Sequence, residues 1–270
     1  GLTILLFLPI CLSGEFIWDD PKLVALNQWT DDWSNIGAMF THDIWASTPI
    51  GAGDFFYYRP MMLVSLAVDQ SFGFGPRGHH FHSLAWHLLC IWLLFQLCKD
   101  SVDSAWPLIG GLSLFALHPL QTEAIAHIAA RNDLMACAGV LGALNLLKKA
   151  DPEAPALLGA GLLSALAIFS KETSFLAPAM LWVLDRARFG HALNPKRYGA
   201  LLLPIGLALG LRMSLGSSGV GIPSLQFGES LPKISESFAF YTGALVFPFN
   251  QTPVVSVSEM TLFWPASIAG

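Results

Sequence analysis

Apolar residues come in long runs along this chain, and short polar segments separate them. The runs cover residues 2–13, 80–98, 106–120, 134–147, 157–170, 173–185, 198–215 and about 236–249. A helix needs about 20 residues to cross the hydrocarbon core of a bilayer, so several runs need flanking residues to complete a span. The pattern predicts an all-α fold, a polytopic bundle of transmembrane helices.

Composition agrees with this prediction. Of 270 residues, 54% are hydrophobic and 12% are charged, and the mean hydropathy is +0.56. An ordinary globular domain carries roughly a quarter charged residues. The values exclude a disordered chain and most soluble enzymes. The net charge of -5, without a basic stripe, argues against nucleic acid as a partner.

The two ends of the chain are expected to be cuts through helices. The first residue is Gly1, and the apolar run from Leu2 to Leu12 is too short for a span. The apolar segment 261–270 also stops early. We therefore interpret residues 1–270 as a single membrane domain truncated at both ends. Four cysteines are read as small buried hydrophobes rather than disulfides or metal ligands: Cys11, Cys90, Cys98 and Cys137.

Charged residues are divided unequally among the loops. Segment 14–58 is acidic, and three shorter loops are basic. The acids are Glu15, Asp19, Asp20, Asp31, Asp32, Asp43 and Asp54, against Lys22; the bases are Lys99, Lys148, Lys149, Arg186, Arg188, Lys196 and Arg197. Basic loops face the cytoplasm in membrane proteins, which makes 14–58 the first extracytoplasmic loop. Alternation then puts 118–133, 171–172 and 216–235 on the outer side. The Gly/Ser-rich segment 216–221 predicts a flexible outer loop.

The first candidate site is the pair Asp19-Asp20, which directly follows the first apolar run. Two adjacent carboxylates repel each other, and apolar neighbours disfavour ionisation, so one pKa is expected to rise. Such a carboxylate can take a proton from a hydroxyl nucleophile. An N-cap for a short helix beginning at Pro21 explains the pair equally well. Both interpretations stay open, because one Asp can cap while the other reacts.

The second candidate is Arg59 in Tyr57-Tyr58-Arg59-Pro60, where the long loop returns to the membrane. A guanidinium at headgroup depth suits a bidentate contact with phosphate. The alternative is an interfacial anchor, since Tyr and Arg are common in that belt.

The third candidate runs from His118 to Asp133 between two apolar runs. Glu123 and His127 are four residues apart and share a helix face, and Arg131 follows closely. Ionisable residues at membrane depth indicate function by default. The alternative is a structural pair of Arg131 with Asp133 or Glu123. The charged pair Lys171-Glu172 likewise lies between two apolar runs, 157–170 and 173–185.

His79, His80 and His82 are close enough in sequence to suggest a metal-binding cluster. Adjacent histidines point in different directions on a helix, and no carboxylate has ligand spacing, so no metal site is predicted. His80 and His87 are expected to share one helix face. The sequon at Asn250 is weak evidence for glycosylation because Pro253 follows it.

Six motifs occur in a fixed order. They are Asp-Asp at 19–20, Tyr-Arg-Pro at 58–60, Gly-x-His-x6-His at 78–87, His-Pro-x-x-Thr-Glu-Ala at 118–124, Ala-Arg-x-Asp-Leu at 130–134 and Lys-Glu at 171–172. Together they resemble the membrane half of the TPR-linked O-mannosyltransferases, in the GT-C superfamily of membrane glycosyltransferases. The resemblance covers about Phe16 to Asp185, with a fainter echo at Phe247-Pro248.

The resemblance implies a GT-C-like bundle whose long first extracytoplasmic loop carries short juxtamembrane helices. It implies an inverting transfer of a mannose-like sugar from a polyprenyl phosphate to a hydroxyl of a protein or glycan, on the extracytoplasmic face. Asp19 or Asp20 would be the catalytic base. Residues implied to bind the donor phosphate or sugar are Arg59 and Arg131 foremost, then His80, His118, Glu123, Asp133, Lys171 and Glu172. No tightly bound cofactor is expected and no divalent metal is required.

Two departures from the family pattern matter. Ser83 stands where the family usually has Asn, and the TPR array is absent from this sequence. An alternative is therefore a non-catalytic GT-C-like subunit of a larger membrane complex, with other membrane subunits as partners. A transporter is disfavoured because no inverted repeat is visible. Membrane lipid is an expected partner in each case, and the bacterial inner membrane is favoured over the endoplasmic reticulum.

Overall fold

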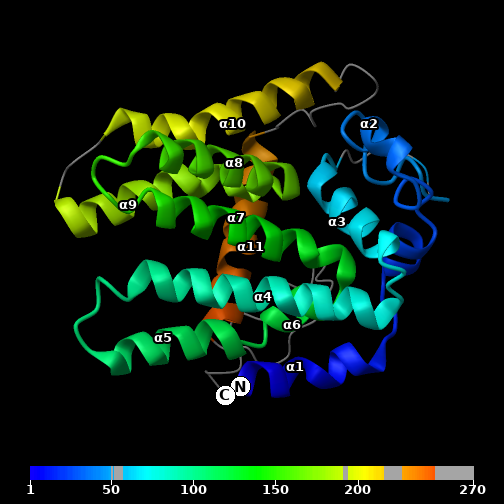
Figure 1. Cartoon of the computed structure of the whole chain (residues 1–270), viewed down its shortest axis with the longest axis horizontal. Helices are drawn as coiled ribbons and strands as arrows, with labels where there is room; N and C mark the ends of the chain where they lie inside the picture. The colour runs from blue at the N-terminus through cyan, green and yellow to red at the C-terminus, as the bar shows by residue number, and fades with distance from the viewer. Residues whose placement is uncertain (50, 52–56, 191–193, 216–226, 247–270) are drawn as a thin grey trace.

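A computed structural model describes residues 1–49, 51, 57–190, 194–215 and 227–246. Within these ranges every regular element is a helix (Figure 1), which confirms the predicted fold class. The predicted loop at 216–221, the sequon at Asn250 and the motif echo at Phe247-Pro248 lie outside the described residues.

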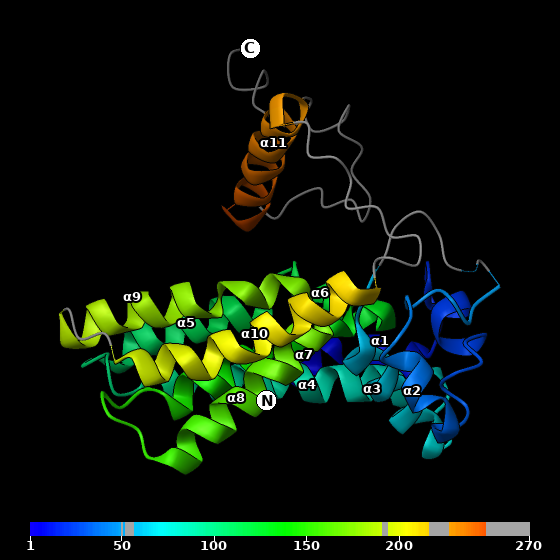
Figure 2. The same ribbon diagram turned by 90° about the horizontal axis from the view of Figure 1, so that it is seen from above.

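Six longer helices lie side by side and alternate in direction (Figures 1 and 2). They are α4 (Pro76–Cys98), α5 (Ala105–Leu117), α7 (Arg131–Leu146), α8 (Ala154–Ser170), α9 (Ala177–Phe189) and α10 (Pro195–Leu215). Helix α1 (Leu2–Ser13) packs beside α4, whereas α11 (Phe227–Val246) runs across the direction of the six helices and lies to one side of them (Figures 1 and 2). Each predicted apolar run thus falls largely within one helix, to the extent that it is described.

Proline and glycine mark the helix ends. Pro76 and Pro195 are the first residues of α4 and α10, where the missing N–H costs nothing. Helix α1 ends at Gly14, with φ 65°, and α9 ends at Gly190, with φ 77°. A residue without Cβ adopts a positive φ at little cost, so glycine suits the position directly after each helix.

Helices α7 and α8 make the closest packing in the bundle. A Cβ atom added at Gly139 would lie 2.7 Å from the carbonyl oxygen of Leu163, and one at Gly142 would lie 2.9 Å from the Leu163 side chain. These distances are below van der Waals contact. The two glycines therefore allow the helix backbones to approach each other.

In the part of the chain that the structure describes, two helices, α4 and α10, are long and apolar enough to cross a membrane. Only 28% and 17% of their most apolar stretches are buried inside the molecule. Large apolar side chains also project outward elsewhere: Leu114 is 66% exposed and Leu162 is 65% exposed. An apolar exterior of this kind fits a lipid environment, as expected for a polytopic membrane bundle.

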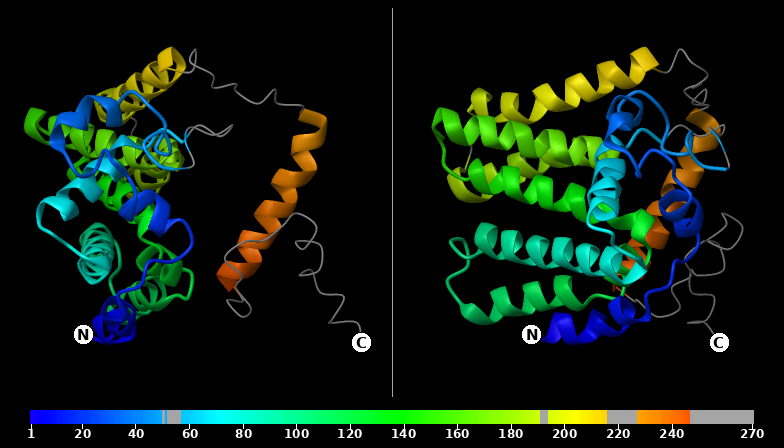
Figure 3. Two further views of the ribbon diagram at one scale, coloured as in Figure 1. Left: turned by 90° about the vertical axis from the view of Figure 1, so that its right-hand side faces the viewer. Right: turned by 45° about the vertical axis from the view of Figure 1, so that its right-hand side comes forward.

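The basic loops meet at one end of the bundle. Lys148 Nζ lies 2.9 Å from an Asp100 carboxylate oxygen, and Arg188 Nε donates to Ser101 Oγ at 3.2 Å. The acidic loop lies at the opposite end, which faces the viewer in Figure 3, left. The division of charge between two ends is therefore a property of the fold. Which end faces the cytoplasm stays a prediction from the count of bases.

Short helices cover the acidic end. Segment 14–58 carries η1 (Pro21–Ala25), η2 (Trp33–Asn35) and α2 (Ile36–Met39), as the resemblance implied. The sequence pattern missed α3 (Pro60–Ser71), a short helix that buries Met62 and Leu63 against Leu23 and Met39. The remaining short elements are α6 (Gln121–Ala126), η3 (Ile128–Ala130) and η4 (Glu172–Leu176).

Candidate functional site

The carboxylate of Asp20 is completely buried and accepts three backbone hydrogen bonds. The N–H groups of Ile128 and Ala129 donate to it at 3.1 and 2.8 Å, and the N–H of Ile17 donates at 3.3 Å. Asp20 thereby caps η3, which is more than a hundred residues away in sequence. The predicted cap of the helix beginning at Pro21 is wrong, because no side-chain cap bond forms there.

Asp19, by contrast, is exposed to solvent. The two adjacent carboxylates therefore have different environments: one is a buried structural acceptor and the other is accessible. Of the two predicted base candidates, Asp19 has the accessible carboxylate that a proton transfer requires.

Arg131 is completely buried, and its guanidinium makes a network of hydrogen bonds. Nη1 lies 2.5 Å from Asp69 Oδ2 and donates to Ser65 Oγ at 3.0 Å. Nε donates to Ser83 Oγ at 3.0 Å, and Nη2 donates to the carbonyl oxygen of His79 at 2.8 Å. The alternative pairing of Arg131 with Asp133 or Glu123 is therefore wrong. Asp69, at the end of α3, is its partner.

The same Asp69 carboxylate binds two histidines of α4. His79 Nδ1 lies 2.6 Å from Oδ2, and His82 Nδ1 contacts Oδ1. The indole of Trp86 donates to His82 Nε2 at 3.0 Å, so His82 accepts there and donates from Nδ1. Burial raises the pKa of Asp69, but the hydrogen bonds from both histidines and the charge of Arg131 outweigh it and hold this pKa well below its usual range.

Two ion pairs lie nearer the surface at this end. Arg59 donates to Glu172 from Nη2 at 3.0 Å and from Nε at 3.3 Å, a two-bond contact. Lys171 Nζ lies 2.5 Å from Asp133 Oδ1. Burial raises the pKa of Glu172, yet the hydrogen bond and the charge of Arg59 outweigh it, so this pKa lies below its usual value. The pair Lys171-Glu172 thus connects two of the predicted segments, the one that contains Arg59 and the one that contains Asp133.

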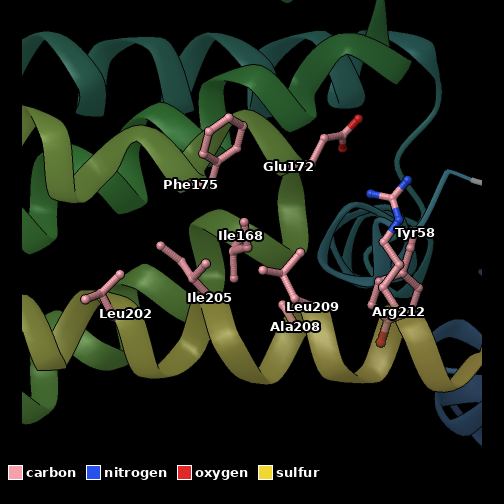
Figure 4. Close-up of a pocket in the computed structure, with 9 residues that line it drawn as sticks. All are labelled: Tyr58, Ile168, Glu172, Phe175, Leu202, Ile205, Ala208, Leu209 and Arg212. Carbon is pink, nitrogen blue, oxygen red and sulfur yellow. The ribbon is translucent and has the colours of Figure 1, made fainter. Parts of the chain in front are cut away.

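A cavity of about 430 Å³ opens beside Glu172, between α8, η4 and α10. Figure 4 shows Glu172, Arg212 and Tyr58 toward one end of it and the apolar residues Phe175 and Leu202 toward the other. The cavity therefore combines a charged end with an apolar wall. The remaining lining residues are Ile168, Ile205, Ala208 and Leu209.

The two candidate histidines both bind backbone carbonyls. His80 Nε2 lies 2.9 Å from the oxygen of Glu15, and its Nδ1 lies 3.2 Å from that of Ile125. His118 accepts from the N–H of Leu120 at 3.2 Å and reaches the oxygen of Leu245 at 3.0 Å. Both rings hold segments together.

His87 bonds the oxygen of Ala116 at 3.1 Å and is buried like His80, so these two share a helix face as predicted. Glu123 is exposed and forms no ion pair within the ranges that the structure describes. It therefore does not orient Arg131 in this arrangement.

Sequence reasoning missed two residues of this region. The sequence around Asp69 shows no partner for its carboxylate, because His79, His82 and Arg131 lie on other helices. Arg212 is an arginine at the end of an apolar run, and a lone charge at membrane depth is a signal that could have found it. No cluster of three or more potential metal-ligand side chains occurs in the described part of the chain.

The predicted segments form one connected structure. Asp20 binds η3, which leads into α7. Asp133 of α7 binds Lys171. Glu172, the residue after Lys171, binds Arg59. Residues far apart in the sequence are thus linked by direct bonds at the acidic end of the bundle.

Comparison with known proteins finds sequence relatives. Protein O-mannosyl-transferase Tmtc2 of Drosophila melanogaster is 27% identical over 187 residues, which is 66% of this chain and 20% of that protein. Protein O-mannosyl-transferase TMTC2 of Homo sapiens is 28% identical over 243 residues, 84% of this chain and 28% of that protein. By sequence, the chain is similar to the protein O-mannosyl-transferases. The resemblance drawn from the six motifs is confirmed.

The Xenopus laevis protein O-mannosyl-transferase tmtc2 is 33% identical over 136 residues, 50% of this chain and 16% of that protein. The chain therefore spans between about a sixth and somewhat over a quarter of the length of these protein O-mannosyl-transferases. No protein-family model matches the chain. No solved structure matches it.

Proposed function

We propose that this chain is the membrane part of an inverting glycosyltransferase that uses a polyprenyl-phosphate sugar as its donor. The sugar is mannose-like, the acceptor is a hydroxyl group of a protein or glycan, and the reaction takes place at the acidic, extracytoplasmic end. The observation that carries the proposal is that an accessible carboxylate (Asp19), two cations (Arg59 and Lys171) and an amphiphilic cavity belong to segments at the same end of the bundle. The names of the relatives, which are protein O-mannosyl-transferases, support the choice of mannose.

Asp19 is the proposed base. The acceptor oxygen attacks C1 of the sugar while its proton passes to the Asp19 carboxylate, and the bond from C1 to the phosphate oxygen breaks. The polyprenyl phosphate leaves with a greater negative charge, which nearby cations stabilise. Asp20 is a positioning residue in this scheme, because its carboxylate is already bound to backbone N–H groups.

Arg59 and Lys171 are the proposed cations for the phosphate. A two-bond contact such as that between Arg59 and Glu172 has the geometry in which a guanidinium binds a phosphate. The cavity beside Glu172 offers an apolar wall for a lipid chain, and its volume of about 430 Å³ lies in the range of ligand pockets. Arg131 acts indirectly, by holding α3, α4 and α7 together.

The test is transfer by the purified chain in lipid nanodiscs, with polyprenyl-phosphate mannose and a Ser/Thr peptide. Asp19→Asn is expected to abolish transfer without changing stability. Asp20→Asn is expected to lower both, because it weakens the cap of η3. Asp31→Asn, at an exposed acid in the same loop, is the matched control. Full transfer by Asp19→Asn overturns the assignment of the base.

A second function, that of a non-catalytic subunit, is favoured by one observation. Asp20 and Arg131 are completely buried and used in internal contacts, as in a purely structural scaffold. That function predicts no transfer by the wild-type chain and stable co-purification with other membrane subunits that none of these substitutions affects.

A further inference from the structure

Trp18 has an unusual backbone. Its φ of 49° is the only positive value at a non-glycine residue within the described part of the chain. The left-handed region is unfavourable for an L-residue, and for a bulky side chain it is a true outlier. The other positive φ values within those ranges belong to Gly14, Gly51, Gly73 and Gly190. Where only the conformation matters, this chain uses glycine.

The turn around Trp18 is closed from two sides. The N–H of Asp20 donates to the oxygen of Ile17 at 2.9 Å, and the buried Asp20 carboxylate accepts from the N–H of Ile17. The same carboxylate is fixed to η3. Trp18 and Asp19, between the two anchored residues, are both exposed as a result. The buried Asp20 thus presents the indole and the proposed base side by side.

Core packing does not explain the tryptophan. Its side chain is 50% exposed, and its ring contact is with His127, at 5.1 Å between centroids and 81° between planes. This edge-to-face contact fixes the plane of the indole. His127 in turn lies next to Asp20, with Nε2 3.6 Å from Oδ1, which is longer than a hydrogen bond. An interfacial anchor needs an exposed Trp, but it needs neither a left-handed backbone nor a fixed ring plane.

We propose that Trp18 is the platform for the pyranose ring of the transferred sugar, and that His127 is the residue that positions it. A pyranose presents a face of C–H groups, and the negative π-face of an indole attracts such groups. Asp19, the next residue, then lies beside the acceptor that attacks the sugar. The proposal rests on the proposed function for the identity of the sugar, while its test measures binding alone.

The test is saturation-transfer difference NMR with methyl α-mannopyranoside and the wild-type chain in nanodiscs. Saturation transfer to the C–H protons of the mannoside ring is expected in the wild type. Mannoside binding is expected to be at least tenfold weaker in Trp18→Ala and to recover partially in Trp18→Phe. His127→Ala is expected to weaken binding and His127→Phe to restore it, because a phenyl ring keeps the edge-to-face contact. Trp106→Ala, at an 81% exposed tryptophan of α5, is the matched control.

Three results would overturn the assignment of Trp18 as the sugar platform. The first is no saturation transfer to the mannoside in the wild type, and the second is unchanged mannoside binding in Trp18→Ala. The third is displacement of the mannoside by a Ser/Thr peptide, which would make Trp18 part of the acceptor site instead. Circular dichroism of each variant verifies that its helices are intact. Mannoside binding that depends on Trp18, in a chain that transfers nothing from the lipid donor, supports the platform and counts against the proposed function alone.

Discussion

The buried network around Asp69 gives the sharpest prediction about stability. Asp69→Asn keeps the shape of the side chain and removes its charge. In the folded chain Arg131 is completely buried, and Asp69 is the acid that contacts it directly, at 2.5 Å. The substitution therefore leaves a buried guanidinium without its counter-charge, and it weakens the bonds from His79 and His82.

Removing one partner of a buried ion pair costs about 3–5 kcal/mol, because the other charge stays buried. The exposed pair of Asp100 and Lys148 is the control, and Asp100→Asn is expected to change the free energy of unfolding far less, because solvent screens an exposed pair. The double variant Asp69→Asn with Arg131→Gln is expected to lose less free energy of unfolding than the sum of the two single changes. The reason is that it leaves no unpaired charge in the interior.

The assay is reversible unfolding in mixed micelles with increasing sodium dodecyl sulfate. The depressed pKa of Asp69 sets the direction with pH: its stabilisation is fully present above the unfolded pKa of about 3.9 and is lost as pH falls toward the folded pKa. The difference between wild type and Asp69→Asn should therefore narrow from pH 7 to pH 3. A cost for Asp69→Asn no larger than that of Asp100→Asn, or strictly additive costs in the double variant, would refute the reasoning.

Three further predictions use the same preparations. Trp18→Gly should be more stable than Trp18→Ala by about 1 kcal/mol, because glycine relieves the left-handed backbone; the opposite order in unfolding would show that position 18 is unstrained. Gly139→Ala should cost about 1–3 kcal/mol by overpacking α7 against α8, whereas Gly110→Ala, at a site with open space, should be neutral or stabilising; equal effects would contradict the close approach. Arg59→Lys should raise the KM for the lipid donor about tenfold with little change in kcat, since a lysine cannot make the two-bond contact; an unchanged KM would remove Arg59 from the phosphate site.

The helices were readable from the sequence because a lipid-facing helix leaves a continuous apolar run. The runs at 80–98 and 198–215 became α4 and α10 with small shifts at their ends. The short helix α3 was missed, because Ser65 and Asp69 interrupt its apolar residues, whereas α1, of the same length, is almost entirely apolar. Proline at its first position and the apolar pair Met62 and Leu63 are the signals it does carry.

The segments of the candidate site were also readable, because charges are rare in this chain and stand out at membrane depth. Their partners were not. The sequence offered Asp133 and Glu123 for Arg131, but packing of α3 against α4 and α7 supplies Asp69 instead. Likewise, Asp19 and Asp20 are equivalent as neighbours in sequence, and only the position of η3 buries one and leaves the other exposed.

The amino-acid sequence by itself determined that this is a helical membrane chain, which segments carry its ionisable residues, and which family it resembles. These properties depend on local composition and on the order of short motifs. The tertiary structure decided which charge meets which, where the cavity opens, and that Trp18 is presented in a strained turn. Those properties depend on contacts between residues that can be more than a hundred positions apart, and such contacts exist only once the helices have packed.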